Sequence, residues 1–348
     1  MPAPPDGGLG TGGGASDLAP PPGRAPVPLV SRRLSRSALV GLVAWSALLF
    51  VRLDVGGALE FQAHLVLVAP LVLVPLLVDA ALPFTFDDRV DPALVAASWL
   101  VLPGALAAAA SFLVPAGTLA GALVLPWGLA TVAVAGWGLR TAWDRWRVGG
   151  LDVPEGVLAV GLASLPGGAA WLFAARTGGE PGPLVALLGA AHVHYAAFAA
   201  AVWSGLLGRA LAGRGVVFRR VHAAAAVGLV AGFWLGALGA AAGGGTLETL
   251  GGGVLAASAV ATGGLGVALG PALNDRSAGL MVAVSGGALA LAMGLSLTDA
   301  GLGPAGGAWT LPRHGWLDAV GFGLWGALGW RRLRPRPAPL VAGGVAPA

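Results

Sequence analysis

Ten runs of about 20 mostly apolar residues fill the chain between residues 37 and 331 and constrain its fold more than any other feature. Such a run, coiled as a helix, crosses a hydrocarbon core of about 30 Å. Only 10% of the 348 residues are charged, whereas about 25% is usual for a soluble domain. The sequence therefore predicts an all-α, polytopic membrane helix bundle. The runs lie near residues 37–53, 62–82, 92–114, 116–138, 156–175, 183–207, 222–242, 252–270, 277–298 and 315–331.

The arginines predict how this bundle is oriented. If the N-terminus is cytoplasmic, 17 of the 20 basic residues fall on inner segments and only Arg52, Arg176 and Arg313 fall on outer ones. This asymmetry is what the positive-inside rule expects for ten helices with both termini in the cytoplasm. We therefore expect a disordered cytoplasmic tail over residues 1–36, a transmembrane domain over 37–331 and a second cytoplasmic tail over 332–348.

Several classes of function are excluded by what the sequence lacks. The basic residues are scattered in small groups, so no nucleic-acid interface is expected. The chain has no cysteine, which removes thiolate metal sites and cysteine nucleophiles. It has no Walker loop, GxSxG or HExxH motif, and its clustered glycines fall inside apolar runs. An enzyme is therefore less expected than a non-enzymatic membrane protein.

The sixth run carries the ionisable residues that most need an explanation. His192 lies nine residues after Pro183, or roughly 13 Å along a helix, which places it close to the bilayer midplane. Ionisable groups at that depth are costly and usually mark function. His192 and His194 point about 200° apart on a helix, whereas His192 and Tyr195 share a face. One histidine can therefore face a central site while the other bonds a neighbouring helix, and a role in interhelical hydrogen bonds alone remains open.

Two further pairs lie at helix starts on the predicted outer side. Glu60 and His64 are four residues apart, as are His314 and Asp318, so each pair shares a helix face. A carboxylate beside an imidazole orients it or favours its charged form. We expect these pairs to form the outer mouth of a site that contains His192, His194 and Tyr195, although each pair alone is also typical of an ordinary interfacial pair.

The remaining acidic residues receive structural interpretations. Asp79 lies near the end of its run, where its side chain is expected to reach the membrane interface. Glu155 is expected in a short loop. The seventh run has a stripe of small residues, with Gly228, Gly232 and Gly236 spaced every four residues, and we expect it to let another helix approach closely.

Two segments resemble the signatures of the YndJ-like family of bacterial membrane proteins. His192–Phe198 is similar to the family's H-F-H-Y-A-G-F, and His314–Phe322 is similar to its H-G-x-L-N-A-x-G-F. Glu60 and the apolar residues 70–76 resemble the family's early helix. The chain departs from the signatures at Val193, Ala197 and Asp318, which stand in place of Phe, Gly and Asn. The resemblance implies a multi-pass protein of the bacterial inner membrane, described in places as a transporter, and implies no substrate.

Two functions of different classes follow from these residues. The first is a transporter or permease of a small solute, in which His192, His194 and Tyr195 bind the solute or relay protons and the two outer pairs form its mouth; it needs the lipid bilayer and no cofactor. The second is a redox protein or enzyme in which His192, His194 and His314 are the candidate ligands of haem or a transition metal, because imidazole is a common ligand of iron, copper and zinc.

Overall fold

The computed structural model describes residues 27–84, 90–297 and 314–337, and within these ranges the chain is helical with no strand. The predicted all-α class is confirmed. Eight of the described helices are long and apolar enough to cross a membrane, which indicates a membrane protein. They span Leu59–Ala81, Pro92–Leu113, Thr118–Arg147, Val153–Thr177, Pro183–Ala210, Val216–Ala241, Thr246–Ala272 and Arg276–Ser296.

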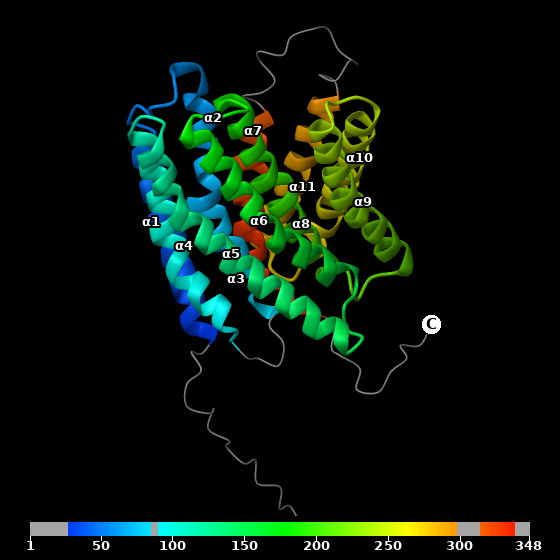
Figure 1. The fold of residues 1–348 in the computed structure, drawn as a ribbon. Coiled ribbons are helices and arrows are strands. Elements are labelled where there is room, and N and C mark those ends of the chain that lie inside the picture. The colour runs from blue at the N-terminus through cyan, green and yellow to red at the C-terminus, as the bar shows by residue number, and fades with distance from the viewer. Residues whose placement is uncertain (1–26, 85–89, 298–313, 338–348) are drawn as a thin grey trace, which may run out of the picture.

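Most of the helical segments run antiparallel to the next one in the chain (Figure 1). Three continuous rods contain a π-helical segment, in which the backbone hydrogen bonds join residues five apart. These rods are α2 (Gly57–Val68), η1 (Ala69–Leu73) and α3 (Val74–Ala81); α7 (Pro183–His192), η5 (Val193–Ala199) and α8 (Ala200–Ala210); and η8 (Leu317–Leu324) with α13 (Trp325–Leu333). The others are α1 (Val27–Leu48), α4 (Pro92–Ala110), α5 (Thr118–Arg147), α6 (Val153–Thr177), α9 (Val216–Ala241), α10 (Thr246–Leu269) and α11 (Arg276–Leu297).

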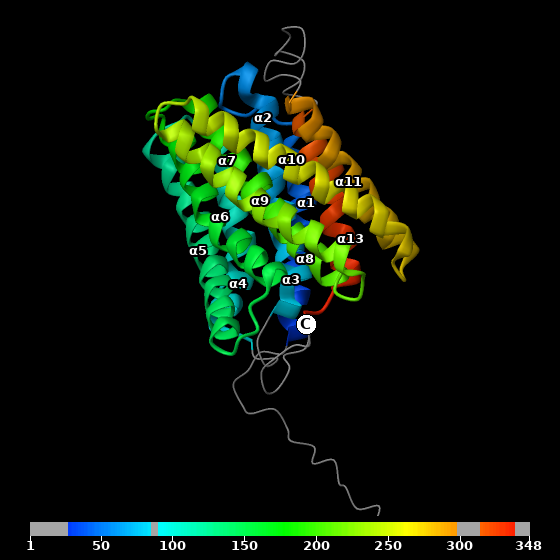
Figure 2. The ribbon, with the colours of Figure 1, turned by 90° about the vertical axis from the view of Figure 1, so that its right-hand side faces the viewer.

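The α2–α3 rod is the most buried of the eight apolar helices. The other helices cover it so fully that 83% of its most apolar stretch is buried. α1 and α4 pack on one side of it, whereas α7, η8 and α13 contact it on others. α9, α10 and α11 lie beside one another along the remaining side of the bundle (Figure 2).

The first helix begins earlier than the apolar run predicts. α1 starts at Val27, so residues 27–36 are helical and do not belong to a disordered tail. Val30, Leu34 and Ala38 recur every four residues and are buried, whereas Arg32 and Arg36 lie on the exposed face. An amphipathic stretch of this kind forms a helix by burying one face. Its arginines interrupt the apolar pattern, so the predicted apolar run begins only at residue 37.

The stripe of small residues on α9 packs against α10, as expected. A Cβ atom added to Gly232 would overlap the backbone of Leu255, and one added to Gly251 would overlap the backbone of Gly236. A backbone cannot move aside as the end of a side chain can. The two helices therefore approach closely only because these positions lack a side chain.

Candidate functional site

A cavity of about 600 Å³ is lined by α2, by the α7–η5 segment, by α10 and α11, and by the rod that contains η8. Of the seven residues that the sequence selects, His192, Tyr195, His314 and Asp318 line it. These four residues come from two rods that are more than 100 residues apart in sequence. The fold thus brings the sixth and tenth apolar runs together beside the second. Most of the remaining wall is apolar, with Leu65, Leu187, Leu229, Leu255 and Phe322 among its residues.

The three π-helical segments contact one another, and two of them, η5 and η8, line this cavity. η1, η5 and η8 belong to separate rods and contact one another. In η1 the regular hydrogen-bond ladder is interrupted in any case, because Pro70 and Pro75 have no N–H to donate. π-helical turns are rare and often occur at functional sites. Their convergence distinguishes the centre of this bundle from its periphery.

The side chains of η5 and α7 are held by backbone carbonyl groups. The Tyr195 hydroxyl donates a hydrogen bond of 2.6 Å to the carbonyl oxygen of Leu65 and so joins η5 to α2. The Nδ1 atom of His192 lies 2.8 Å from the carbonyl oxygen of Leu188, one turn earlier. Because a carbonyl can only accept, this nitrogen carries the proton of the neutral ring.

His314 and Asp318 form the predicted pair. The Nε2 atom of His314 lies 2.9 Å from Oδ2 of Asp318, and both side chains are partly buried. The other ring nitrogen, Nδ1, lies 3.0 Å from the carbonyl oxygen of Ala292 and 3.2 Å from the Ser296 hydroxyl, both on α11. The pair therefore links the last rod to α11 at the wall of the cavity.

His194 lies on the opposite side of η5, away from the cavity. Its side chain is fully buried, and Nδ1 lies 2.8 Å from the carbonyl oxygen of Ala190. The ring stacks on Trp127, with 6.1 Å between the centroids, and sits against Gly168, where any side chain would overlap it. The divergence of the two histidines that the spacing predicts is confirmed. His194 packs between α5 and α6, and its other ring nitrogen, Nε2, is buried with no hydrogen-bond partner among the described residues.

Glu60 and His64 do not line the cavity either. The Glu60 carboxylate accepts a hydrogen bond of 2.8 Å from the backbone N–H of Leu53, in the segment before α2. The two ring nitrogens of His64 lie 2.8 Å and 3.0 Å from the carbonyl oxygens of Glu60 and Leu48. The two side chains therefore hold the chain between α1 and α2, and they do not form a carboxylate–imidazole pair.

Four polar residues of the cavity wall are absent from the sequence-based selection: Gln62, Glu248, Thr249 and Ser296. Glu248 lies in the first turn of α10, where acidic residues are common because they interact with the helix dipole. Gln62 is uncharged, and its signal in the sequence is its position in an otherwise apolar run. Only the packing of the helices distinguishes these residues from other polar residues near helix ends.

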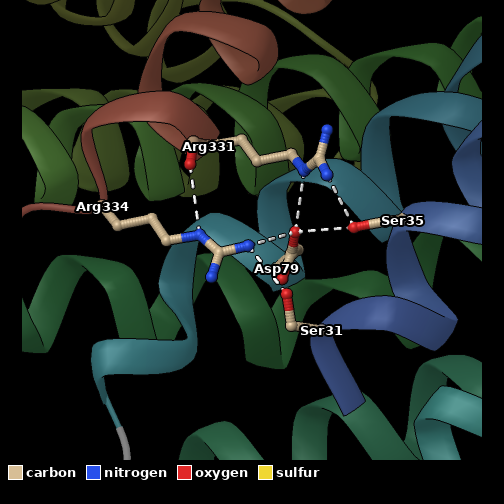
Figure 3. Close-up of polar contacts among 5 residues, drawn as sticks. All are labelled: Ser31, Ser35, Asp79, Arg331 and Arg334. Atoms are coloured by element: carbon tan, nitrogen blue, oxygen red, sulfur yellow. Dashed lines mark hydrogen bonds and ion pairs between the residues drawn. The ribbon is translucent and has the colours of Figure 1, made fainter. Parts of the chain in front are cut away.

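Asp79 forms an ion cluster at the opposite end of the bundle from the α2 end, and the expectation that it reaches the interface is wrong. Its side chain is fully buried, and Oδ2 accepts hydrogen bonds of 2.8 Å from both Arg331 and Arg334 (Figure 3). Ser35 donates to the same oxygen, and Ser31 accepts from Arg334. The cluster joins α1, α3 and α13. Asp79 is buried because these elements, distant in sequence, supply its partners.

Glu155 is also buried, in the first turn of α6, and does not lie in a loop. Its two carboxylate oxygens accept hydrogen bonds of 2.7 and 2.9 Å from the guanidinium group of Arg209. Arg145 lies 3.6 Å from the same carboxylate. All three side chains are at most 5% exposed. This second ion cluster ties the ends of α5 and α8 to the start of α6.

A model of the family described as YndJ-like protein matches residues 64–322, about three quarters of the chain. The chain belongs to the YndJ-like protein family. No curated protein and no solved structure matches it. The matched range of this YndJ-like protein contains both signature segments, and with them the four predicted residues that line the cavity.

The positions at which this YndJ-like protein departs from the family signatures have clear surroundings. Val193 and Ala197 pack with Phe233 in a small apolar cluster on the α9 side of η5. Asp318, where the signature has Asn, contacts the His314 ring at 2.9 Å. The first two departures therefore affect packing, whereas the third places a carboxylate at the cavity wall.

The metal candidates His192, His194 and His314 are not gathered into one site. His194 is separated from the cavity that the other two line. Among the residues that the structure describes, no group of three or more His, Asp or Glu side chains could hold a metal ion. Ligation of haem or a metal stays a prediction, and the described geometry does not favour it.

Proposed function

We propose that this YndJ-like protein is a permease-type transporter of the bacterial inner membrane that binds a small solute in the cavity beside η1, η5 and η8. The proposal is carried by the cavity that η5 and η8 line, at the place where both contact η1. Transporters bind their substrates near the bilayer midplane, where irregular backbone is tolerated because it lines a cavity. A membrane anchor or sensor, in which these histidines only hold helices together, has no need of a cavity lined by polar groups.

Proton coupling belongs to the same proposal. His192 and His314 both line the cavity, and histidine is the side chain whose ordinary pKa places its change of charge near neutral pH. His314 also contacts Asp318, which can share a proton with it. Protonation at these two positions would alter the charge that a bound solute meets.

The test is a flux measurement in proteoliposomes that contain a pH-sensitive dye. Single solutes from a panel of small amines, carboxylates and sugars are added outside, with and without a pH gradient. We expect at least one of them to move protons, and His192→Gln and Asp318→Asn to abolish the signal. Asp144→Asn, on α5 and away from the cavity, is the matched control and should retain it. Equal flux in all variants, or no flux with any solute, contradicts the proposal.

A further inference from the structure

The hydrogen bonds around the cavity use up most of the donors in its wall. Tyr195 donates its only hydroxyl proton to Leu65, and Thr249 donates to the carbonyl oxygen of Gly245 at 3.1 Å. The neutral His192 ring donates from Nδ1 to Leu188. Each of these groups is left with acceptor capacity alone, because each has one proton to give.

Further acceptors in the wall have no partner. The Oε1 atom of Gln62 is buried and forms no hydrogen bond with any described residue. A buried acceptor without a partner costs stability, and a ligand that donates to it relieves part of that cost. The Nε2 atom of the neutral His192 ring is an acceptor as well. The cavity therefore matches a ligand that supplies N–H or O–H donors.

Apart from the two histidines, which are cationic only when protonated, the charges of the wall have one sign. Glu248 and Asp318 contribute carboxylates, and no arginine is among the described residues that line the cavity. Asp318 pairs with His314, whereas Glu248 forms no ion pair with a described residue. With the histidines neutral, an anion in this cavity would meet like charge and no arginine. A cation would meet Glu248, an exposed carboxylate that forms no ion pair with a described residue.

The apolar part of the cavity wall indicates what the uncharged part of the ligand should be. Most of the wall is apolar, and the aromatic rings of Tyr195 and Phe322 belong to it. A volume of about 600 Å³ is in the range of sites that bind small molecules, which bury most of the ligand against apolar side chains. A small inorganic cation would leave this surface unused.

We propose that the cavity binds an organic ammonium ion with an apolar body, whose N–H groups donate to Gln62 and His192 and whose charge pairs with Glu248. This assignment names the solute class for the proposed function and rests on it. Binding at equilibrium requires no transport, so the ligand class and the transport function can fail separately.

The experiment measures binding to the full chain in lipid nanodiscs by calorimetry, with empty nanodiscs as the blank. Three probes share one aromatic body: 2-phenylethylammonium, its N-trimethyl derivative, which has the charge but no N–H donor, and 3-phenylpropionate, which has the opposite charge. We expect saturable binding of the ammonium, binding of the trimethyl derivative about tenfold weaker, and no binding of the carboxylate. Carboxylate binding as tight as that of the ammonium, or no saturable ammonium binding below about 10 mM, overturns the proposal.

Three variants connect the binding to the named residues. Glu248→Gln should weaken ammonium binding about tenfold or more, because the buried charge loses its partner, whereas Glu248→Asp keeps the charge and should restore most of it. Asp144→Asn should bind as the unmodified chain does. Size-exclusion profiles and helix content establish that each variant is folded. Equal affinity in Glu248→Gln overturns the assignment.

The two proposals are separated by comparing binding with flux. Ammonium binding without flux of any solute contradicts the permease and keeps the ligand class. Coupled flux of a carboxylate from the solute panel, with no ammonium binding, keeps the permease and overturns the ligand class.

Discussion

The cavity and the two ion clusters use the same kinds of side chain in opposite ways. At the Asp79 and Glu155 clusters, buried carboxylates are matched by arginines from other helices. In the cavity, the exposed carboxylate of Glu248 has no cationic partner among the described residues, and the buried oxygen of Gln62 has no donor. Matched charges stabilise the contact between helices. A buried acceptor without a donor costs stability, and a ligand that donates to it can recover part of that cost.

The comparison teaches that burial alone does not mark a functional residue in this bundle. Asp79 and Glu155 are the most deeply buried acidic groups described, and arginines from other helices already neutralise their charge. His194 is equally buried and is packed against Trp127. The groups that remain available for chemistry are the less buried ones that line the cavity.

The largest expected effect comes from breaking the Glu155 cluster. Glu155→Gln leaves Arg209 and Arg145 buried without a counter-charge, and breaking a buried ion pair from one side costs about 3–5 kcal/mol. We expect a marked fall in the midpoint of thermal unfolding, followed by tryptophan fluorescence in mild detergent. An unchanged midpoint would mean that the cluster does not stabilise the bundle.

A smaller loss is expected from Asp79→Asn. Asp79 is fully buried, but Arg331 and Arg334 are each 37% exposed and can turn toward solvent when the carboxylate is removed. The free energy of unfolding should fall by about 1–3 kcal/mol. The double variant with Arg331→Gln should lose less than the sum of the two single changes, and strict additivity would show that the pair is not coupled.

Removing a polar side chain from the cavity wall should not lower the free energy of unfolding, in contrast to the substitutions in the ion clusters. Gln62→Leu removes a buried acceptor that has no partner, so the free energy of unfolding should stay level or rise by about 1 kcal/mol. Ammonium binding should weaken in the same variant. The same unfolding and binding measurements check both results, and a clear loss of stability would show that Gln62 is satisfied within the fold.

The smallest effect concerns Asp275, in the turn before α11. Its carboxylate accepts hydrogen bonds from Arg332 and Ser277, and above all the bond from Arg332 holds its pKa below the ordinary value for Asp. A lowered pKa contributes stability above the unfolded pKa of about 3.9 and loses it as the pH falls below that value. The unfolding midpoint of Asp275→Asn should therefore lie slightly below that of the unmodified chain at pH 7. The difference should shrink below about pH 4, and a difference that grows there contradicts the assignment.

Much of the architecture follows from the sequence because lipid-facing helices are read from local composition. The apolar runs fall on helices, and the four-residue spacing of His314 and Asp318 places them in contact. The spacing of His192 and His194 likewise separates the two rings. The same local reading fails at α1, where arginines on one face interrupt the apolar pattern and conceal the start of the helix.

Only part of the candidate site could be predicted from the sequence. Glu60 and His64 share a helix face, as their spacing requires, yet their side chains bond to backbone groups of the segment before α2. Gln62, between them in the sequence, lines the cavity in their place. Which face of a helix meets which neighbour depends on how the helix is rotated in the bundle, and apolar runs without a polar face carry little information on that rotation.

The helical class, most helix positions, the family and the His314–Asp318 pair follow from the sequence alone, because each depends on residues near one another along the chain. The meeting of η1, η5 and η8, the pairing of Asp79 and Glu155 with arginines, and the place of Glu248 at the cavity wall depend on how the helices pack. The physical reason is that a buried charge is defined by its partners, and these include Arg209, 54 residues from Glu155, and Arg334, 255 residues from Asp79.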